Sequence, residues 1–391
     1  MSNVDTRDTF DPSVIFKDKP STKAFNRCYY LTFTDPYQYT GSKNFVNKAT
    51  SVSTPAATPA YSGGNIPARQ ITLYQNIEKL GLAIDFTITK TKVEQKKKSK
   101  NGMKLKIYNL CPINQKQIQK GDVVILDCGY NNNVANVFSG IVSTVNSNTK
   151  GSDSYIEISA TELPLPDLRL FQAGSLKFTK GTTLTQVCEK ICELLFELVP
   201  NIVGWDMTEI PDEMVLLRDL VFFDVNLAGH LTDLLHQVGM QYYLHAGIIY
   251  AIYSYEGSRK NKRTTITYLT PLVGMVAIPS AISKSEDSGR TKVVNGKKQK
   301  LKRQVSGWNV KSLLNPNLVI NHYLDLDSHP LDTDLPADGV RGYYRIEKIV
   351  HKGNSFNSKW ESTVHAYDRG QEGLIEEQPY TDLGLWDRKD G

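Results

Sequence analysis

Side chains able to do chemistry are scattered along this chain of 391 residues, and none of their patterns is complete. His230 and Asp233 lie three residues apart on an expected helix, where they could begin a catalytic pair, but no activated serine motif accompanies them. Cys188 and Cys192 are one helical turn apart, yet no two further ligands stand at zinc-site spacing. We therefore expect no catalytic, cofactor-binding or metal site and no enzymatic activity. The seven histidines form no ligand-spaced cluster: His230, His236, His245, His322, His329, His351 and His365.

Two basic stretches each allow a functional and a structural interpretation. The lysines at 96–98 and 100 form either a phosphate-binding patch or a solvated hairpin tip that discourages edge-to-edge pairing of strands. The basic insertion 283–303 either contacts DNA or is an exposed or disordered loop. In both cases we expect the structural interpretation.

An acidic loop carries Asp332, Asp334 and Asp338, near Asp325 and Asp327 at the end of an expected strand. Calcium binding is the functional interpretation of so many carboxylates. Their spacing does not match an EF-hand loop, which also needs a glycine that is absent here. We expect a solvated acidic loop.

The composition is that of a globular chain, with 40% hydrophobic and 22% charged residues, long enough for two to three domains. The net charge of +5 argues weakly against a dedicated nucleic-acid binder. We expect neither a signal peptide nor a membrane span, and assembly in a cytoplasm. Because the cysteines are odd in number, reduced and mostly buried thiols are expected rather than disulfides; they are Cys28, Cys111, Cys128, Cys188 and Cys192.

The spacing of apolar residues predicts the strands and helices that carry these side chains. Residues 82–89 alternate between apolar and polar, which predicts a half-buried strand. A helix is expected over 184–198, capped by Thr182 or Thr183 and stopped by Pro200. A second helix over 227–238 has Asn226 as N-cap and Gly239 as its stop, and a tyrosine-rich hairpin across 246–247 follows it.

Residues 117–162 and 317–368 read as two versions of one three-strand pattern. In each, the first strand ends in Leu-Asp, at 126–127 and at 326–327. We expect the second strands to correspond through Phe138 and Tyr344 and to run into Ile-Val at 141–142 and 349–350. The third strands begin at Tyr155 and Trp360 and end at Glu162 and Asp368. The pattern indicates one β-barrel-like unit used twice.

Several short motifs follow one another at 101–110, Ile118 with 121–122, 128–130, 138–141, 312–316, 342–346, 351–353 and Trp360. In their order and spacing they resemble phage tail baseplate hub proteins, a family also found in contractile injection systems. The similarity covers most of residues 80–368. Where the second unit would carry a glycine like Gly121, this chain has Asn321-His322, although asparagine tolerates a left-handed backbone.

The resemblance implies a β-rich α+β, multidomain fold with two similar tail-tube-like antiparallel β-barrels and an intervening α/β domain. We expect an extended N-terminal arm at 1–69 that drapes over a neighbouring subunit or domain, a first barrel at 70–165 and an α/β domain at 166–263. A second barrel at 264–370, containing the insertion, and a C-terminal tail at 371–391 that docks on a partner would follow.

The resemblance also implies a structural role without bond chemistry. Three chains would form a homotrimer whose six similar units make a pseudo-six-fold ring. That ring would join the hexameric tail tube, or a distal tube protein, to the trimeric central spike at the tail tip of the virion, with tape measure and other baseplate proteins as further partners. DNA would only pass through it during genome ejection.

Two other functions stay open from the sequence. A tail-associated cell-wall hydrolase would need paired carboxylates or a metal cluster in a cleft. A nucleic-acid-binding module would use the two basic stretches and would bind DNA in a salt-dependent way.

Overall fold

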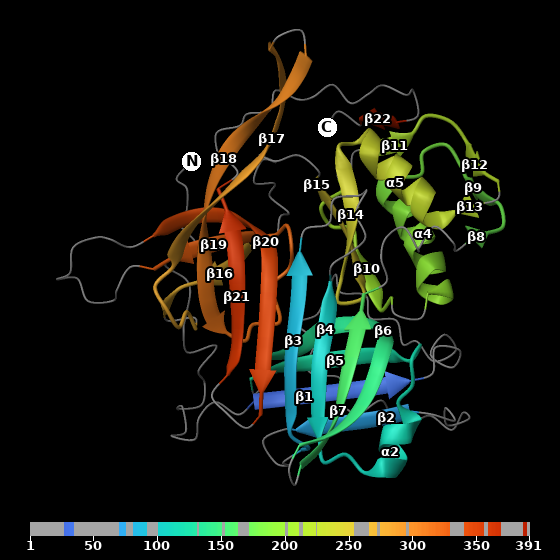
Figure 1. The fold of residues 1–391 in the computed structure, drawn as a ribbon. Helices are drawn as coiled ribbons and strands as arrows, with labels where there is room; N and C mark the ends of the chain where they lie inside the picture. The colour runs from blue at the N-terminus through green and yellow to red at the C-terminus, as the bar shows by residue number, and fades with distance from the viewer. Residues whose placement is uncertain are drawn as a thin grey trace, which may run out of the picture.

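The computed structural model describes the main strands and helices of the chain, and all statements below refer to these residues. Most of the strands join one thirteen-stranded sheet, and a separate region holds the two longer helices (Figure 1). The described residues are 27–34, 70–75, 81–91, 101–130, 133–150, 153–162, 172–199, 202–210, 214–223, 225–253, 266–271, 274–294, 297–328, 340–355, 359–368 and 386–388.

Five antiparallel strands of this sheet form what we call unit one. They pair in the order β3-β4-β7-β6-β5, and a short helix, α2 (Pro112–Gln117), connects β4 to β5. The strands are β3 (Ile84–Thr91), β4 (Gly102–Tyr108), β5 (Val123–Tyr130), β6 (Asn133–Lys150) and β7 (Asp153–Thr161).

Five later strands form unit two and pair in the order β17-β18-β21-β20-β19, again antiparallel throughout. Counted along the chain, this is the strand order of unit one. The strands are β17 (Ser280–Val294), β18 (Lys297–Leu313), β19 (Tyr323–Asp327), β20 (Arg341–Asn354) and β21 (Trp360–Tyr367).

The two units also share their irregularities. The β6–β7 ladder has a bulge between Val142 and Thr144, and the β20–β21 ladder has one between Ile346 and Lys348. Val142 accepts a hydrogen bond from Gly121 and donates one to Asp122, the two residues before β5. Ile346 likewise accepts from Asn321 and donates to His322, the two residues before β19. Bulges are specific local features of a ladder, so their coincidence sets the correspondence between units residue by residue.

The turn before β5 and β19 confirms the expected role of asparagine. Gly121 has φ +97° and Asn321 has φ +68°, and each donates its N–H to the residue before the bulge in the adjoining strand. Both positions need a left-handed backbone, which glycine adopts freely and asparagine tolerates better than most residues.

The Leu-Asp pairs at 126–127 and 326–327 occupy corresponding positions, and both leucines are fully buried. The expected matches within the second strand are wrong. The bulges align Ile141-Val142 with Arg345-Ile346 rather than with residues 349–350, and Phe138 corresponds to Gly342 rather than to Tyr344. In the third strand Trp360 corresponds to Ser154, one residue before Tyr155.

Each unit is extended by strands from elsewhere in the chain. In unit one, β1 (Arg27–Thr34) pairs with β5 and with β2 (Gln70–Gln75). In unit two, β16 (Ile266–Leu269) pairs in parallel with β19. The strand of the expected N-terminal arm therefore pairs with unit one of the same chain, which agrees with the expected contact between the arm and a neighbouring domain. The rest of that arm lies outside the described residues.

Alternation along the strands builds the two cores. In β3 every second side chain from Ile84 is buried, and Leu31 of β1 and Leu126 of β5 pack into the same cluster. Residues of β19, β20 and β21 form a second cluster. Figure 1 shows β1 crossing β3, β4 and β7, so the sheet of unit one bends back over its own core.

The units are joined by direct pairing of β3 with the second half of β20, from Asp85↔Asn354 to Thr91↔Lys348. This internal junction makes the two units parts of one continuous sheet. Its partners are about 260 residues apart in the chain, so local sequence patterns do not contain it.

Along the chain, the α/β region lies between the two units. Helix α4 (Leu184–Leu198) begins at a Thr183 capping box, and α5 (Leu227–Gln237) begins at Asn226, as expected. A hairpin of β14 (Met240–His245) and β15 (Ile248–Tyr253) follows, with both turn residues at positive φ. Both helices and the hairpin share one core.

Small strands complete this region. Strand β22 of the C-terminal tail pairs with β11, so that short part of the tail docks on the chain's own α/β region. The remaining strands are β8 (Gln172–Ala173), β9 (Leu176–Phe178), β10 (Gly204–Asp206), β11 (Met214–Leu216), β12 (Leu220–Phe222), β13 (Val225–Asn226) and β22 (Trp386–Arg388).

The basic insertion 283–303 is a two-stranded ribbon, and the expected loop or disorder is wrong. Strands β17 and β18 pair from Ser280↔Asn309 to Val294↔Lys297, whereas β21 accompanies β18 only from Gly307. The ribbon therefore extends beyond the sheet, as the long orange hairpin in Figure 1 shows. The two residues between Val294 and Lys297 are Asn-Gly, the strongest short hairpin signal.

Candidate functional site: a buried polar row at the junction of the units

Three adjacent strands of unit one place a polar side chain at the same level of the buried face. These are Lys90 of β3, Asn101 just before β4 and Glu162 just after β7, and they are 0%, 1% and 1% exposed. We call them the polar row. Each continues the inward-facing series of its strand, in which all other members near it are apolar.

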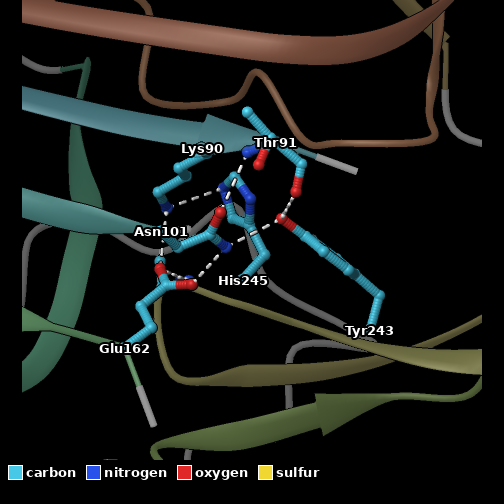
Figure 2. A network of polar contacts seen from close by, with 7 residues as sticks. Lys90, Thr91, Asn101, Glu162, Tyr243 and His245 are labelled. Carbon is cyan, nitrogen blue, oxygen red and sulfur yellow. Dashed lines mark hydrogen bonds and ion pairs between the residues drawn. The ribbon is translucent and has the colours of Figure 1, made fainter. Parts of the chain in front are cut away.

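The row is held by short contacts, drawn in Figure 2. Lys90 Nζ lies 3.4 Å from Glu162 Oε1, and Asn101 Nδ2 donates to Glu162 Oε2 at 2.7 Å. The backbone N–H of Thr91 donates to Asn101 Oδ1 at 2.9 Å, which fixes the orientation of the amide.

The β14–β15 hairpin closes over the polar row. Lys90 Nζ lies 3.2 Å from His245 Nε2, Asn101 Nδ2 is 3.0 Å from the Tyr243 hydroxyl, and the Ala246 N–H donates to Glu162 Oε1 at 3.1 Å. Figure 2 shows both hairpin side chains pointing at the row. The turn of the hairpin is therefore bonded directly to unit one.

The same hairpin packs on unit two. Tyr250 stacks edge-on against His322, with ring centroids 5.5 Å apart, and Tyr243, Tyr250 and Ile252 belong to the core of unit two. Alternate residues of the hairpin instead face the two helices. The hairpin thus bridges both units beside their internal junction.

Burial dominates the electrostatics here. Burial lowers the pKa of Lys90, and the adjacent Glu162 charge opposes that shift. Burial also raises the pKa of Tyr243 well above its usual range, with the Glu162 charge acting in the same direction. On β20, burial and then the charge of Lys90 lower the pKa of His351 to about 3.

This arrangement is suited to holding parts together. The Lys90, Asn101 and Glu162 side chains are buried and bonded mainly to one another and to the hairpin, so none is presented to a substrate in solution. A buried ion pair adds little net stability when formed, but removing one partner is strongly destabilising. The polar row therefore fixes the hairpin at one position on unit one.

Of the histidines named from the sequence, His245 joins this cluster, whereas the candidate His230–Asp233 and Cys188–Cys192 pairs do not. On α5, Asp233 is exposed and His230 stacks on Phe222, with centroids 4.3 Å apart. Cys188 and Cys192 are buried in the core of the α/β region, as expected, and burial raises both pKa values.

Other candidates fall partly outside the described residues. The lysines at 96–98 and 100 and the acidic loop at 332–338 are not described. Asp327 lies 3.7 Å from Arg341 in an exposed ion pair. Among the described residues, no group of three or more His, Cys, Asp or Glu could hold a metal ion, and no helix is long and apolar enough to cross a membrane.

Sequence reasoning missed the polar row, although a signal was present. Ile84, Phe86 and Ile88 alternate, and Lys90 is the next residue on that face. Ile156, Ile158 and Ala160 lead in the same way to Glu162. Two opposite charges continuing inward-facing series at the same end of a sheet predict a buried pair.

No protein-family model matches the chain, and no curated protein matches it. Solved structures of tail proteins do align with it over much of its length. The tail protein from Neisseria meningitidis MC58 is 9% identical, with a TM-score of 0.44, and the match covers 74% of this chain and 93% of that protein.

Two prophage tail proteins align similarly. The 43 kDa tail protein of prophage MuSo2 from Shewanella oneidensis is 12% identical, with a TM-score of 0.41, and the match covers 74% of this chain and 94% of that protein. Prophage tail protein gp18 from Listeria monocytogenes EGD-e is 9% identical, with a TM-score of 0.37, and the match covers 89% of this chain and 96% of that protein.

Proposed function

We propose that this protein is a structural baseplate hub, in which three chains form a ring that joins a hexameric tail tube to a trimeric spike. The observation that carries the proposal is the repeat within the chain. The two units have the same strand order, and each has a bulge and a left-handed turn at corresponding positions. The resemblance of residues 101–110 and 342–346 to hub proteins supports the same function.

The repeat explains how such a ring could match two symmetries. Two similar units per chain give six similar units in a trimer, whereas the single α/β region occurs three times. A surface built from the units would fit a six-fold partner, and one built from the α/β regions would fit a three-fold partner. In this proposal the curved sheets of the two units are the tube-like barrels.

A hub also has to keep its units at a fixed angle. Three features hold that angle here: the β3–β20 ladder, the buried polar row and the hairpin, which is hydrogen-bonded to unit one and packs on unit two. Rigid elements supported by buried contacts are what a load-transmitting joint needs. In this proposal the chain catalyses no reaction, so release of fragments from peptidoglycan by the purified chain would contradict it.

Native mass measurement of the full chain tests the proposal. We expect a species of three times 43.9 kDa, and class averages from electron microscopy that show a three-fold ring with six similar lobes. A monomer at every concentration, or a ring with another number of chains, would overturn it.

A second candidate function is nucleic-acid binding, favoured by the ribbon of β17 and β18. Residues 283–303 contain eight lysines and arginines and two acidic residues, a net charge of +6 against +5 for the whole chain. A basic two-stranded ribbon that extends from a sheet can contact phosphates without base recognition.

DNA retention measured against salt tests this candidate. The variant replaces Lys292, Lys297, Lys298 and Lys300 by Gln, and the control replaces four lysines on other strands: Lys104, Lys106, Lys348 and Lys352. If the ribbon binds DNA, the slope of log affinity against log salt falls in the first variant only, by about 0.9 for each phosphate that the ribbon no longer neutralises. Equal slopes in both variants would remove this candidate.

A further inference from the structure

The internal junction uses one edge of each unit: the edge of β3 that faces away from β4, and the second half of β20. Under the strand repeat, β3 corresponds to β17 and β20 corresponds to β6. The corresponding edges are therefore the outer edge of β17, residues 280–284, and the second half of β6, residues 144–149. No described strand pairs with either of these edges.

The β6 edge and its counterpart on β20 differ in whether a strand covers them. On β20, Ile349, His351 and Gly353 are buried where β3 pairs beside them. The counterparts Ser147 and Thr149 on β6 are exposed, and Val145 is only partly buried. The same strand position is thus covered in unit two and uncovered in unit one.

The β17 edge is also exposed and has an apolar approach. Ser280, Ala281 and Ser283 are exposed, and the residues just before the strand include Val276 at 50% and Ile278 at 85% exposure. Large aliphatic side chains this exposed beside an unpaired strand are characteristic of a surface that another chain covers.

Residues 144–149 of β6 and 280–283 of β17 lack the usual protection against pairing, and the one charge on the β17 edge, Lys284, is paired with Glu347 of the same unit. Natural edge strands are blocked by inward charges, proline or very short length. Residues 144–149 read Thr-Val-Asn-Ser-Asn-Thr, without charge or proline, on a strand of 18 residues. Residues 280–283 read Ser-Ala-Ile-Ser, and Pro279 marks only where that ladder would end.

We propose that the β17 edge of one copy of this chain pairs antiparallel with the β6 edge of the next copy, repeating the internal junction between chains. This inference rests on the proposed ring and names its interface. The bulges and the pairs Gly102↔Thr161 and Gly307↔Tyr367 set the register. The internal pair Thr89↔Val350 then becomes Ile282↔Asn146, with Ser280 opposite Asn148 and Ala281 opposite Ser147.

Such an interface is head-to-tail, because each chain contributes one β17 edge and one β6 edge. Head-to-tail contacts close into a ring if the rotation between neighbours divides a full turn, and otherwise give open filaments. Three chains would close a ring in which internal and intermolecular junctions alternate. Only the internal junctions would carry the β14–β15 hairpin of the same chain.

Disulfide crosslinking tests the register. In β3, the Ile84 N–H and carbonyl face the β20 side, whereas the Ala83 carbonyl faces β4. Because backbone groups alternate along a strand, the N–H and carbonyl of Thr87 also face β4. Ser280 is the counterpart of Thr87, so its N–H and carbonyl face β18, and the Ser280–Asn148 pair is of the non-hydrogen-bonded kind. Its Cα atoms would lie about 4.5 Å apart, within the range that a disulfide spans.

The test variant is Asn148→Cys with Ser280→Cys, in a chain whose one exposed cysteine is removed by Cys111→Ser. The control is Asn148→Cys with Ala281→Cys, which moves one thiol to the opposite face of the strand. On oxidation we expect a covalent trimer, with at least about tenfold more crosslinking in the test variant than in the control.

The outcomes separate this interface from the proposed function. A native trimer without selective crosslinking would overturn the interface and leave the ring intact. Selective crosslinks that continue beyond three chains would support the edge pairing and contradict the closed trimer. A chain that stays monomeric and uncrosslinked would overturn both.

A second variant tests the same edge without oxidation. Ala281→Pro removes an N–H that faces the proposed neighbour rather than β18, and proline is tolerated at such positions of edge strands. We expect the dissociation constant of the trimer to rise at least about tenfold. Ala281→Val keeps the N–H, so the trimer of this variant should dissociate less readily than that of Ala281→Pro, and equal dissociation constants of the two variants would contradict the interface.

Discussion

Units one and two follow one strand plan, but their corresponding polar positions have different environments. Lys90, Asn101 and Glu162 of unit one correspond to Ser283, Ser306 and Asp368 of unit two. The first set is buried beneath the hairpin, whereas all three members of the second set are exposed. The repeat thus supplies the positions, and the single α/β region decides which of them becomes a buried joint.

The Leu-Asp ends of β5 and β19 show the same effect. Strand β1 pairs along the whole of β5, and burial raises the pKa of Asp127 to about 6. In unit two the ladder between β16 and β19 ends at the pair Leu269↔Leu326, one residue before Asp327. The side chain of Asp327 is therefore 36% exposed and forms an ion pair with Arg341. Identical dipeptides at corresponding positions therefore have different electrostatics because the added strands have different lengths.

The largest expected effect is a difference in stability between variants of Glu162 and of Asp368, the acidic residues that follow β7 and β21. Glu162→Gln keeps the shape of the side chain but leaves the Lys90 ammonium buried without its charge partner, which should lower the free energy of unfolding by about 3–5 kcal/mol. Asp368→Asn, at the exposed counterpart, should change it by less than about 0.5 kcal/mol. Urea unfolding followed by intrinsic fluorescence measures both.

Replacing the whole pair sharpens this comparison. Lys90→Met combined with Glu162→Leu removes both charges from a dry site and should recover part of the lost stability, since well-packed apolar replacements of buried ion pairs are often neutral. A double variant as unstable as Glu162→Gln would show that loss of the Glu162 hydrogen bonds from Asn101 and Ala246, rather than the uncompensated charge, dominates the position.

A second effect concerns pH at the internal junction. His351 on β20 is buried by β3, whereas its counterpart in unit one, Ser147, is exposed. Since the folded pKa is about 3 and the unfolded value is 6.5, the unfolded chain binds a proton that the folded chain does not over this range. Stability contributed by neutral His351 is complete above pH 6.5 and is lost as pH falls towards 3.

At pH 5 this loss amounts to about 2 kcal/mol, from about 1.4 kcal/mol for each pH unit below 6.5. His351→Gln keeps an amide that can bond the Ser362 hydroxyl, which lies 2.8 Å from His351 Nδ1. The variant should therefore be less sensitive to acid between pH 6.5 and 4.5, as measured by urea unfolding at several pH values. Parallel pH profiles for both chains would contradict a role of His351 in acid unfolding.

Local patterns predicted the parts of the fold that depend on neighbours in the sequence. The Thr183 and Asn226 caps, the hairpin across 246–247 and the Leu-Asp echo all follow from turn residues and periodicity. The internal junction could not be predicted in this way, because β3 and β20 are joined only by backbone pairing between distant segments.

Register errors had a physical cause as well. Matching Phe138 with Tyr344 used residue type, but the position of a residue in a ladder is set by pairing and bulges. Phe138 pairs with Leu126, whereas the residue that pairs with the corresponding Leu326 is Gly342, so Phe138 and Tyr344 lie two ladder positions apart. The ribbon was missed because its lysines were given more weight than the Asn-Gly at 295–296.

The smallest expected effects compare the left-handed turns of the two units. An added Cβ at Gly121 meets no atom within 4 Å, so Gly121→Ala should be destabilising through backbone strain alone, by about 1–2 kcal/mol. Asn321 is 4% exposed, and neither its amide nitrogen nor its amide oxygen has a hydrogen-bond partner.

Asn321→Gly should therefore raise the stability of the chain by about 0.5–1 kcal/mol, because glycine relieves the strain and removes a buried amide without partners. Asn321→Ala removes the amide but keeps the strain, so it separates the two contributions. Thermal unfolding of the three variants beside the parent chain measures the order. If Asn321→Gly is less stable than the parent, the asparagine side chain contributes to the turn of unit two in a way that Gly121 cannot in unit one.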